Sequence, residues 1–263
     1  MKKLATASLL GLAICAPAAM ADTVLGLYAG AGVIDFNTSG TLTDLKSPSP
    51  QSAYEVNFKN DLGIKGDNGQ YYYIAIEHGI PVLPNIKLTR TEYSEDATGT
   101  LTHNISIDGQ LFPQGSNVKT NLDLSHTDLT FYYEILDNWV NLDLGLTARK
   151  FDGGIKVHGS YTYLSNVYSV DANQDLGFTM PLIYGRAEID LPLTGLYVAG
   201  EGNWIGYSGS HFYDVWAKVG YTFSFGLGVE AGYRRIQLTV DNMKDINADA
   251  TLSGNYIAAT YHF

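Results

Sequence analysis

The chain has 263 residues, of which 45% are hydrophobic and only 16% are charged, and its formal net charge is −11. Soluble domains usually carry about 25% charged residues. The acidity argues against nucleic-acid binding, which needs clustered Lys and Arg, and no run of about 18 apolar residues predicts a transmembrane helix.

Residues 1–21 have the three parts of a secretory signal peptide. A basic start at Lys2 and Lys3 precedes an apolar run, and Ala19 and Ala21 form the small-residue cleavage signature. We expect cleavage after this segment and export of the remainder through the inner membrane.

Residues 22–263 are the predicted mature domain, whose net charge becomes −13 because the two lysines of the signal are lost. The only cysteine, Cys15, lies in the signal. A lipoprotein signal at Cys15 is an alternative, but Ile14 stands where a small residue is expected. The mature domain is therefore expected to have no disulfide.

Ten β-strands are predicted after the signal, because apolar and polar residues alternate with a period of two. The predicted strands are residues 24–36, 70–78, 85–94, 121–135, 139–151, 178–190, 195–207, 212–223, 226–240 and 251–263. They are 9 to 15 residues long, and a tilted strand needs about ten residues to cross a bilayer. A sheet that spans a membrane must close into a barrel, because open edges leave backbone groups unpaired.

The segment 139–151 shows this alternation most clearly. Its aliphatic face carries Val140, Leu142, Leu144, Leu146 and Ala148, and its polar face carries Asn141, Asp143, Gly145, Thr147 and Arg149. In a barrel the first face would meet lipid and the second would meet the lumen.

Short and long connections alternate along the chain. The short turns are at residues 79–84, 136–138, 191–194 and around Ser224, and the longer polar segments are at 37–70, 94–120, 152–177, 208–211 and 241–250. Periplasmic turns and extracellular loops alternate in this way. We predict an all-β fold, a transmembrane antiparallel up-and-down β-barrel of about ten strands, with eight or twelve as alternatives.

Two places depart from the regular pattern. Residues 53–58, AYEVNF, are either an extra strand or part of a long first loop. Between Leu122 and Leu129 the phase of the alternation slips, which predicts a β-bulge.

The chain ends in NYIAATYHF, with Tyr261 and Phe263 on one face of the last predicted strand. A terminal aromatic residue with another two positions earlier resembles the signal that outer-membrane assembly machinery reads. We therefore expect this machinery as a partner of the C-terminal strand.

Five segments carry a resemblance to a group of uncharacterised proteobacterial outer-membrane β-barrel proteins. They are EHGIPVLPNIKL, LDLSHTDLTFYYEILDNWVNLDLGLTARKFDG, PLIYGRAEIDLPLTGL, GLGVEAGYR and the terminal YHF. The resemblance covers nearly the whole predicted mature chain. It implies a small monomeric barrel in the outer membrane and no particular activity.

The polar faces of the predicted strands place four cations and four anions in the lumen. They are Arg149, Arg186, Lys218 and Arg234, with Asp143, Glu188, Glu201 and Glu230. Charges inside a narrow barrel are costly unless they are paired. Equal numbers predict an ion-paired network that plugs the lumen, and a charge-lined, porin-like pore is the alternative.

Ser125, His126 and Asp128 are candidates for hydrolysis near the outer end of a strand. Adjacent strand residues point to opposite faces, so Ser125 and His126 cannot face one substrate, whereas Asp128 shares the face of His126. A nucleophile would have to come from another strand. We predict that the protein is not an enzyme, with an outer-membrane lipid or peptide hydrolase as the alternative.

We expect no metal and no cofactor. The acids of the segments DLGIKGDNG and VDNMKDINAD lack the spacing of a calcium loop, and zinc, phosphate-loop and dinucleotide motifs are absent. Aromatic residues near the strand ends predict interfacial girdles, with a sugar-binding platform as the alternative.

Together these patterns predict an integral outer-membrane protein of a Gram-negative-type envelope, with a structural or surface-interaction role. Its expected partners are outer-membrane lipid and lipopolysaccharide, and no nucleic acid. The alternatives are a narrow pore for small solutes, the hydrolase, and a soluble β-sandwich as a different fold.

Overall fold

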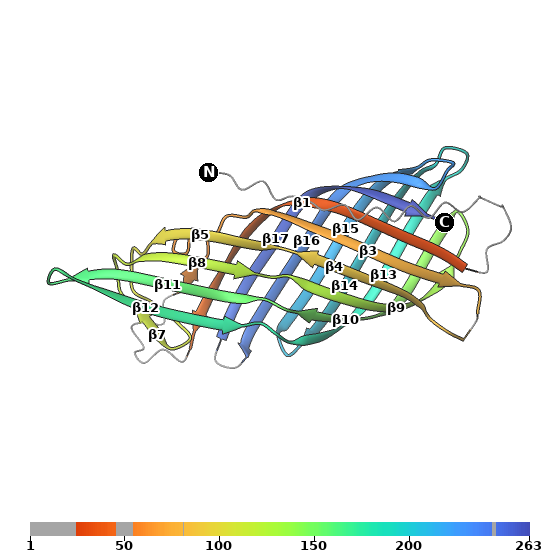
Figure 1. Ribbon diagram of the computed structural model, residues 1–263. Coiled ribbons are helices and arrows are strands. Elements are labelled where there is room, and N and C mark those ends of the chain that lie inside the picture. The colour runs from red at the N-terminus through yellow and green to blue at the C-terminus, as the bar shows by residue number, and fades with distance from the viewer. Residues whose placement is uncertain (1–24, 46–54, 81, 244–245) are drawn as a thin grey trace.

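The computed structural model describes residues 25–45, 55–80, 82–243 and 246–263 (Figure 1). The predicted signal peptide and its cleavage residues Ala19 and Ala21 lie outside these residues. No helix within the described ranges is long and apolar enough to cross a membrane.

Ten antiparallel strands form a closed barrel (Figure 1), which confirms the predicted fold. In chain order they are β1 (Leu25–Asp44), β3 (Asn68–His78), β4 (Asn85–Glu92), β9 (His126–Leu136), β10 (Val140–Phe151), β13 (Thr179–Leu191), β14 (Leu196–Tyr207), β15 (Ser210–Thr222), β16 (Leu227–Met243) and β17 (Ile246–His262). The barrel closes where β17 pairs with β1, with Tyr28 opposite His262. The start of β1 and the end of β17 therefore lie together at the end of the barrel that carries the short turns.

The outward faces of these strands carry exposed apolar side chains. Examples from different strands are Val33, Ile74, Leu146, Val219 and Ile257. Trp139, Phe225 and Phe263 are exposed at the short-turn end, and Tyr72, Trp204 and Tyr233 are exposed towards the other end. An apolar belt between two aromatic rims is the outer surface of a membrane barrel.

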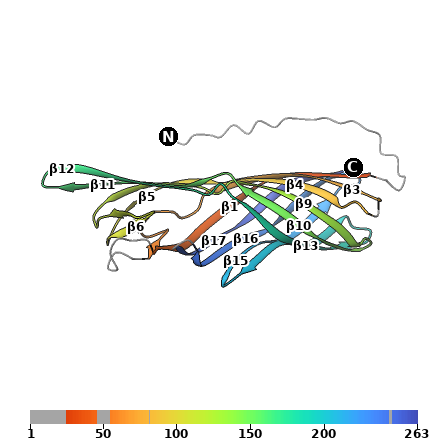
Figure 2. The same ribbon diagram turned by 90° about the horizontal axis from the view of Figure 1, so that it is seen from below.

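A second sheet continues one side of the barrel wall beyond the apolar belt (Figures 1 and 2). It consists of β5 (Ser94–Thr100), β8 (Asn117–Asp123), β11 (Gly154–Tyr163) and β12 (Asn166–Asp175) in the order β12-β11-β8-β5. These strands extend β4, β9, β10 and β13. Much of the segments 94–120 and 152–177, which the sequence predicted as loops, is therefore strand.

The predicted β-bulge between Leu122 and Leu129 is wrong. The pairing keeps one register across the junction of the two sheets, with Thr91 opposite His126 and Ser94 opposite Asp123. What changes is the environment: Leu122 is buried inside the outer sheet, whereas Leu129 is exposed on the barrel exterior. The alternation slips because the apolar residues face inwards in the outer sheet and outwards in the barrel.

A buried apolar core, which we call the cap core, lies between the outer sheet and the outer part of β1. It contains Ile34, Phe36, Leu62, Ile64, Ile105, Phe112, Val118 and Val157. Three short strands contribute to this region, β2 (Val56–Asn57), β6 (Ile105–Ile107) and β7 (Gln110–Phe112). Two residues of the AYEVNF segment thus form β2, which pairs with β1.

Candidate functional site: the barrel lumen

Four charged residues form an outer layer across the lumen. Arg149 of β10 makes two hydrogen bonds to Asp128 of β9, with Nε–Oδ1 at 2.7 Å and Nη2–Oδ2 at 2.6 Å. Arg149 Nη2 also lies 2.6 Å from Asp214 Oδ2 of β15, and Arg234 of β16 makes two further bonds to Asp214, at 2.9 and 2.7 Å. At most 6% of each residue is exposed. The layer therefore joins opposite walls of the barrel with little room for water.

His126 of β9 completes this outer layer. Its Nδ1 lies 2.8 Å from the Leu124 carbonyl oxygen, and its Nε2 accepts a hydrogen bond from Arg234 Nη2 at 3.2 Å. Because a guanidinium can only donate, Nε2 is unprotonated and Nδ1–H donates to the carbonyl. Both ring nitrogens are thus occupied within the chain.

The carboxylates of Asp128 and Asp214 lie close enough to His126 to resemble a metal site, with all three ligand atoms within 4.8 Å of one another. The same carboxylates, however, bind Arg149 and Arg234. The guanidinium groups supply the positive charge that a metal ion would bring, so these residues do not fit a metal.

The structure does not bring Ser125 to His126. The Ser125 Oγ accepts a hydrogen bond from the Tyr93 backbone at 3.2 Å. His126 points instead into the outer layer, where Asp128 is engaged by Arg149. These residues therefore form no nucleophile–base pair.

A middle layer crosses the lumen closer to the short turns. Glu201 of β14 accepts hydrogen bonds from Lys87 of β4 and Lys218 of β15, at 2.5 and 2.6 Å. Lys87 lies on the opposite wall from Lys218, so this layer also links distant strands. Aromatic rings lie next to this layer: the Lys87 Nζ is 5.0 Å from the centre of the Tyr73 ring and 5.9 Å from the centre of the Tyr184 ring.

Glu230, predicted as a member of the ion-pair network, is bound by tyrosine hydroxyls. Tyr256 and Tyr197 donate to its carboxylate at 2.7 and 2.9 Å, and Tyr71 lies at 3.5 Å. Gly220 makes room for this arrangement, because a Cβ there would lie 2.2 Å from the Tyr197 ring. Three phenols thus replace the cation that the sequence suggested.

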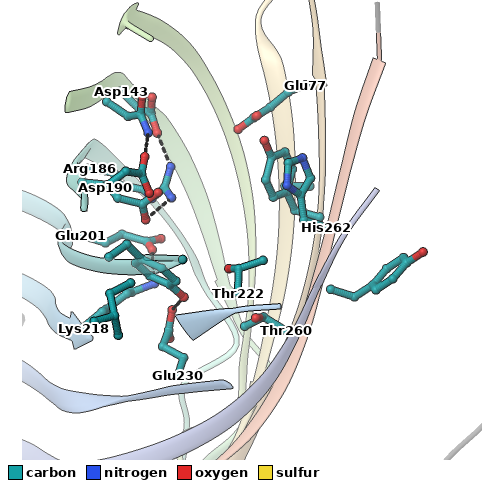
Figure 3. Close-up of a pocket in the computed structure, with 18 of the residues that line it drawn as sticks. Glu77, Asp143, Arg186, Asp190, Glu201, Lys218, Thr222, Glu230, Thr260 and His262 are labelled. Atoms are coloured by element: carbon teal, nitrogen blue, oxygen red, sulfur yellow. Dashed lines mark hydrogen bonds and ion pairs between the residues drawn. The ribbon is translucent and has the colours of Figure 1, made fainter. Parts of the chain in front are cut away.

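An inner pocket of about 440 Å³ opens towards the short turns (Figure 3). Arg186 lies within it, 3.1 Å from Asp143 and 2.6 Å from Glu188. Glu77 on the facing wall accepts a hydrogen bond from Tyr132 at 2.7 Å. The pocket is a vestibule with both signs of charge and an excess of acid.

The middle layer closes the end of this pocket that lies away from the short turns. Lys87, Glu201 and Lys218 line both the inner pocket and a separate cavity of about 20 Å³ beneath the outer layer. The smaller cavity holds about one water molecule. Two ion-paired layers therefore separate the inner pocket from the outer end of the barrel.

The predicted lumen residues all lie inside the barrel, but they pair differently from a simple cation–anion match. The structure brings Arg186 to Asp143 and Glu188, and Lys218 to Glu201. Arg149 instead pairs with Asp128 and Asp214, and Arg234 pairs with Asp214; the sequence analysis had left both aspartates out of the network. It had also left out Lys87, which pairs with Glu201. Asp214 does share the inward phase of Trp216 and Lys218, a signal that could have found it.

The predicted C-terminal signal residues lie at the short-turn end. The Phe263 backbone pairs with Leu27 in both directions, at 2.8 and 2.9 Å. Tyr261 faces Ala29 across the closing seam. These contacts place the aromatic end of the chain at the closure of the barrel.

No protein-family model matches the chain, and no curated protein sequence is significantly similar to it. Among solved structures, the chain resembles the outer-membrane protease OmpT from Escherichia coli, with a TM-score of 0.54 and 13% identity over 90% of this chain and 97% of that one. The toluene transporter TodX of Pseudomonas putida matches with a TM-score of 0.35 and 9% identity over 90% of both chains. A monoaromatic hydrocarbon channel, CymD, matches with a TM-score of 0.37 and 6% identity over 90% of this chain and 88% of that one.

The class of fold is therefore the closed antiparallel barrel that is also found in a bacterial outer-membrane protease. The likeness concerns the fold alone.

Proposed function

We propose that this chain is a non-enzymatic, integral outer-membrane protein whose lumen is sealed by ion pairs and whose outer sheet acts at the cell surface. The observation that carries the proposal is the outer layer of Asp128, Arg149, Asp214 and Arg234, which spans the barrel and is almost fully buried.

The outer surface of the barrel supports the membrane location. Exposed aliphatic rows would be costly in water but favourable against acyl chains. A basic residue follows the last outward apolar residue of three strands, two positions further along. These pairs are Leu88 and Arg90, Ala148 and Lys150, and Tyr233 and Arg235. Cations at this level suit the phosphates of a lipid headgroup region.

The sealed lumen favours a structural or surface role over a pore. A solute crossing the barrel would have to break buried bonds in both layers, and removing a partner from a buried ion pair costs about 3–5 kcal/mol. His126 does not favour a hydrolase, because Arg234 and the Leu124 carbonyl occupy its two ring nitrogens.

Export, assembly and oligomeric state belong to the same proposal. We infer cleavage of residues 1–21, passage through the periplasm, and recognition of Tyr261 and Phe263 by the assembly machinery. The inferred product is a monomer surrounded by outer-membrane lipid and lipopolysaccharide. Phe263→Ala should lower the fraction of folded barrel in cells, as read by the heat-dependent gel shift, while Phe225→Ala serves as an exposed aromatic control.

Two measurements test the proposal. Cell fractionation should place the protein in the outer membrane, in a form that runs faster on gels before boiling than after. Lipid vesicles that contain the folded protein are fused with planar bilayers, which should show no steady conductance. Protease digestion of the vesicles verifies that the protein is inserted. A defined, reproducible channel would overturn the sealed lumen, and recovery as a detergent-free soluble protein would overturn the location.

A further inference from the structure

The hairpin of β11 and β12 projects furthest from the barrel and extends beyond the short strands of the cap core (Figure 1). Near its base, Val157 is buried, and Phe112 packs directly on Gly159, where a Cβ would lie 2.5 Å from the ring. Tyr161 and Tyr163 continue the same face of β11, because alternate strand residues share a face. Tyr163 is 61% exposed, so this aromatic face continues after its cover has ended.

A stacked pair of tyrosines forms the floor of a cavity at this place. Tyr161 lies opposite Tyr168 of β12, and their rings stack with centroids 5.5 Å apart and an interplanar angle of 19°. The segment from Pro113 to Asn117 forms the facing side. Together they line an open cavity of about 780 Å³, a volume within the range of small-molecule sites.

The lining is aromatic and polar but carries no charged side chain. Gln114 and Asn117 provide amides, and Tyr161 and Tyr168 provide rings and phenol hydroxyls. Ionic ligands are usually held by side chains of opposite charge, and the lining of this cavity has no such side chain. The net charge of the chain, −11, also disfavours an anionic ligand. Ring faces and uncharged hydrogen-bonding groups instead match a ligand that has C–H faces and many hydroxyls.

The turn that closes the hairpin is held in an unusual backbone conformation. Leu164 and Ser165 have φ values of 46° and 66°, where two-residue hairpin turns normally use Asn or Gly. Leu164 is nevertheless 77% exposed. Backbone strain of this kind is often found at functional sites. Here the strained turn directly follows Tyr161 and Tyr163.

We propose that this cavity binds a neutral saccharide, with the Tyr161–Tyr168 pair as its stacking platform. The ligand is a glycan presented from outside the cell. The hairpin extends away from the apolar belt and from Arg90, Lys150 and Arg235, which lie at the outer edge of that belt. The proposal deepens the surface role proposed above, but binding itself can be measured in detergent and does not depend on the location.

The test uses the full mature chain folded in detergent. Neutral di- to tetrasaccharides of glucose, galactose and N-acetylglucosamine are titrated by saturation-transfer NMR and calorimetry, beside sialylated and sulfated glycans and purified lipopolysaccharide. We expect at least one neutral oligosaccharide to bind. Tyr168→Ala should weaken that binding about tenfold, since a lost ring contact of about 1.4 kcal/mol corresponds to this factor.

Matched variants separate the site from the fold. Tyr168→Phe keeps the ring and should retain most of the affinity, and Tyr207→Ala removes an exposed tyrosine from another hairpin and should change nothing. All variants should keep the heat-dependent gel shift. Binding only of charged glycans or lipopolysaccharide, binding of no glycan, or equal binding by Tyr168→Ala would each overturn the proposal. A conducting or soluble protein that still binds neutral glycans would overturn only the proposed function.

Discussion

The barrel wall and the outer sheet follow the same strand paths but turn their apolar side chains in opposite directions. Along β10, Leu144 and Leu146 point outwards and are exposed, while Arg149 points inwards and is buried. Along β11, which continues the same path, Val157 points inwards and is buried, while Lys156 on the outer face is exposed.

This reversal teaches that the surroundings, and not the strand geometry, decide which face is apolar. In the barrel the apolar face meets lipid, and the lumen is filled by ion pairs and tyrosines. In the outer sheet the outer face meets water, and the inner face must pack on a core. β1 makes the same change between Val33, which is exposed, and Ile34, which is buried. The level at which the phase reverses therefore marks the proposed membrane surface.

The largest effect is expected in the barrel half of the comparison. Arg149→Ala leaves Asp128 and Asp214 buried without one of their cations, and breaking such a pair costs about 3–5 kcal/mol. Urea unfolding in lipid vesicles, followed by the gel shift, measures the loss. Lys150→Ala, which removes an exposed neighbour, is the control and should cost far less. Equal effects of the two variants would show that the outer layer does not stabilise the barrel.

The outer sheet should respond to loss of apolar packing instead. Phe112→Ala creates a cavity in the cap core, with an expected cost of about 3 kcal/mol. Hydrogen exchange should accelerate in β11 and β12 while the barrel strands remain protected. Leu111→Ala, next in sequence but exposed, should leave exchange unchanged. Uniform acceleration throughout the barrel would mean that the two regions unfold as one unit.

Glu230→Gln tests the tyrosine-bound acid of the lumen at a smaller scale. The variant keeps the shape of the side chain but weakens its bonds with Tyr197 and Tyr256, because hydrogen bonds to a charged group contribute about 1.5–3 kcal/mol and neutral ones about 1 kcal/mol. We expect a loss of about 1–2 kcal/mol in the same urea assay. An unchanged midpoint would mean that the carboxylate charge is not used.

The smallest effect is expected at Asp152, between the two regions. Hydrogen bonds from Arg90 and then from Lys150 hold the pKa of this carboxyl below its usual range. Because its pKa is lower in the folded protein, its contribution is present at neutral pH and is lost as the pH falls through the lowered pKa. Exposed ion pairs contribute below about 1 kcal/mol, so Asp152→Asn should slightly flatten the acid limb of the stability profile. A larger loss at neutral pH than that of Glu230→Gln would contradict this order.

Much of the barrel could be predicted from the sequence because each membrane strand shows a single apolar face. The alternation in residues 139–151 alone was enough to place Asp143 and Arg149 in the lumen. Their pairing could not be read in the same way, because the register between distant strands such as β10 and β15 leaves no local pattern. Asp128 and Asp214 were therefore absent from the predicted network.

The outer sheet was harder to predict for a physical reason. Its strands bury only part of one face, and Thr, Ser and Gly occupy many of the remaining positions, so residues 94–120 and 152–177 resembled polar loops. The cap core gathers Leu62, Ile105 and Phe112 from separate segments, which no single periodicity connects. The slip near Leu122 was a signal of the reversal, although it predicted a bulge.

Spin-label accessibility along the path from β10 to β11 tests the central claim most directly. Leu146→Cys and Lys156→Cys place labels on the same outer face, in a mature chain that is expected to lack other cysteines. The label at position 146 should be relaxed mainly by oxygen, which concentrates in lipid, and the label at position 156 mainly by a water-soluble nickel chelate. If both labels responded equally to the nickel chelate in folded, vesicle-inserted protein, the apolar belt would not face lipid and the account would be wrong.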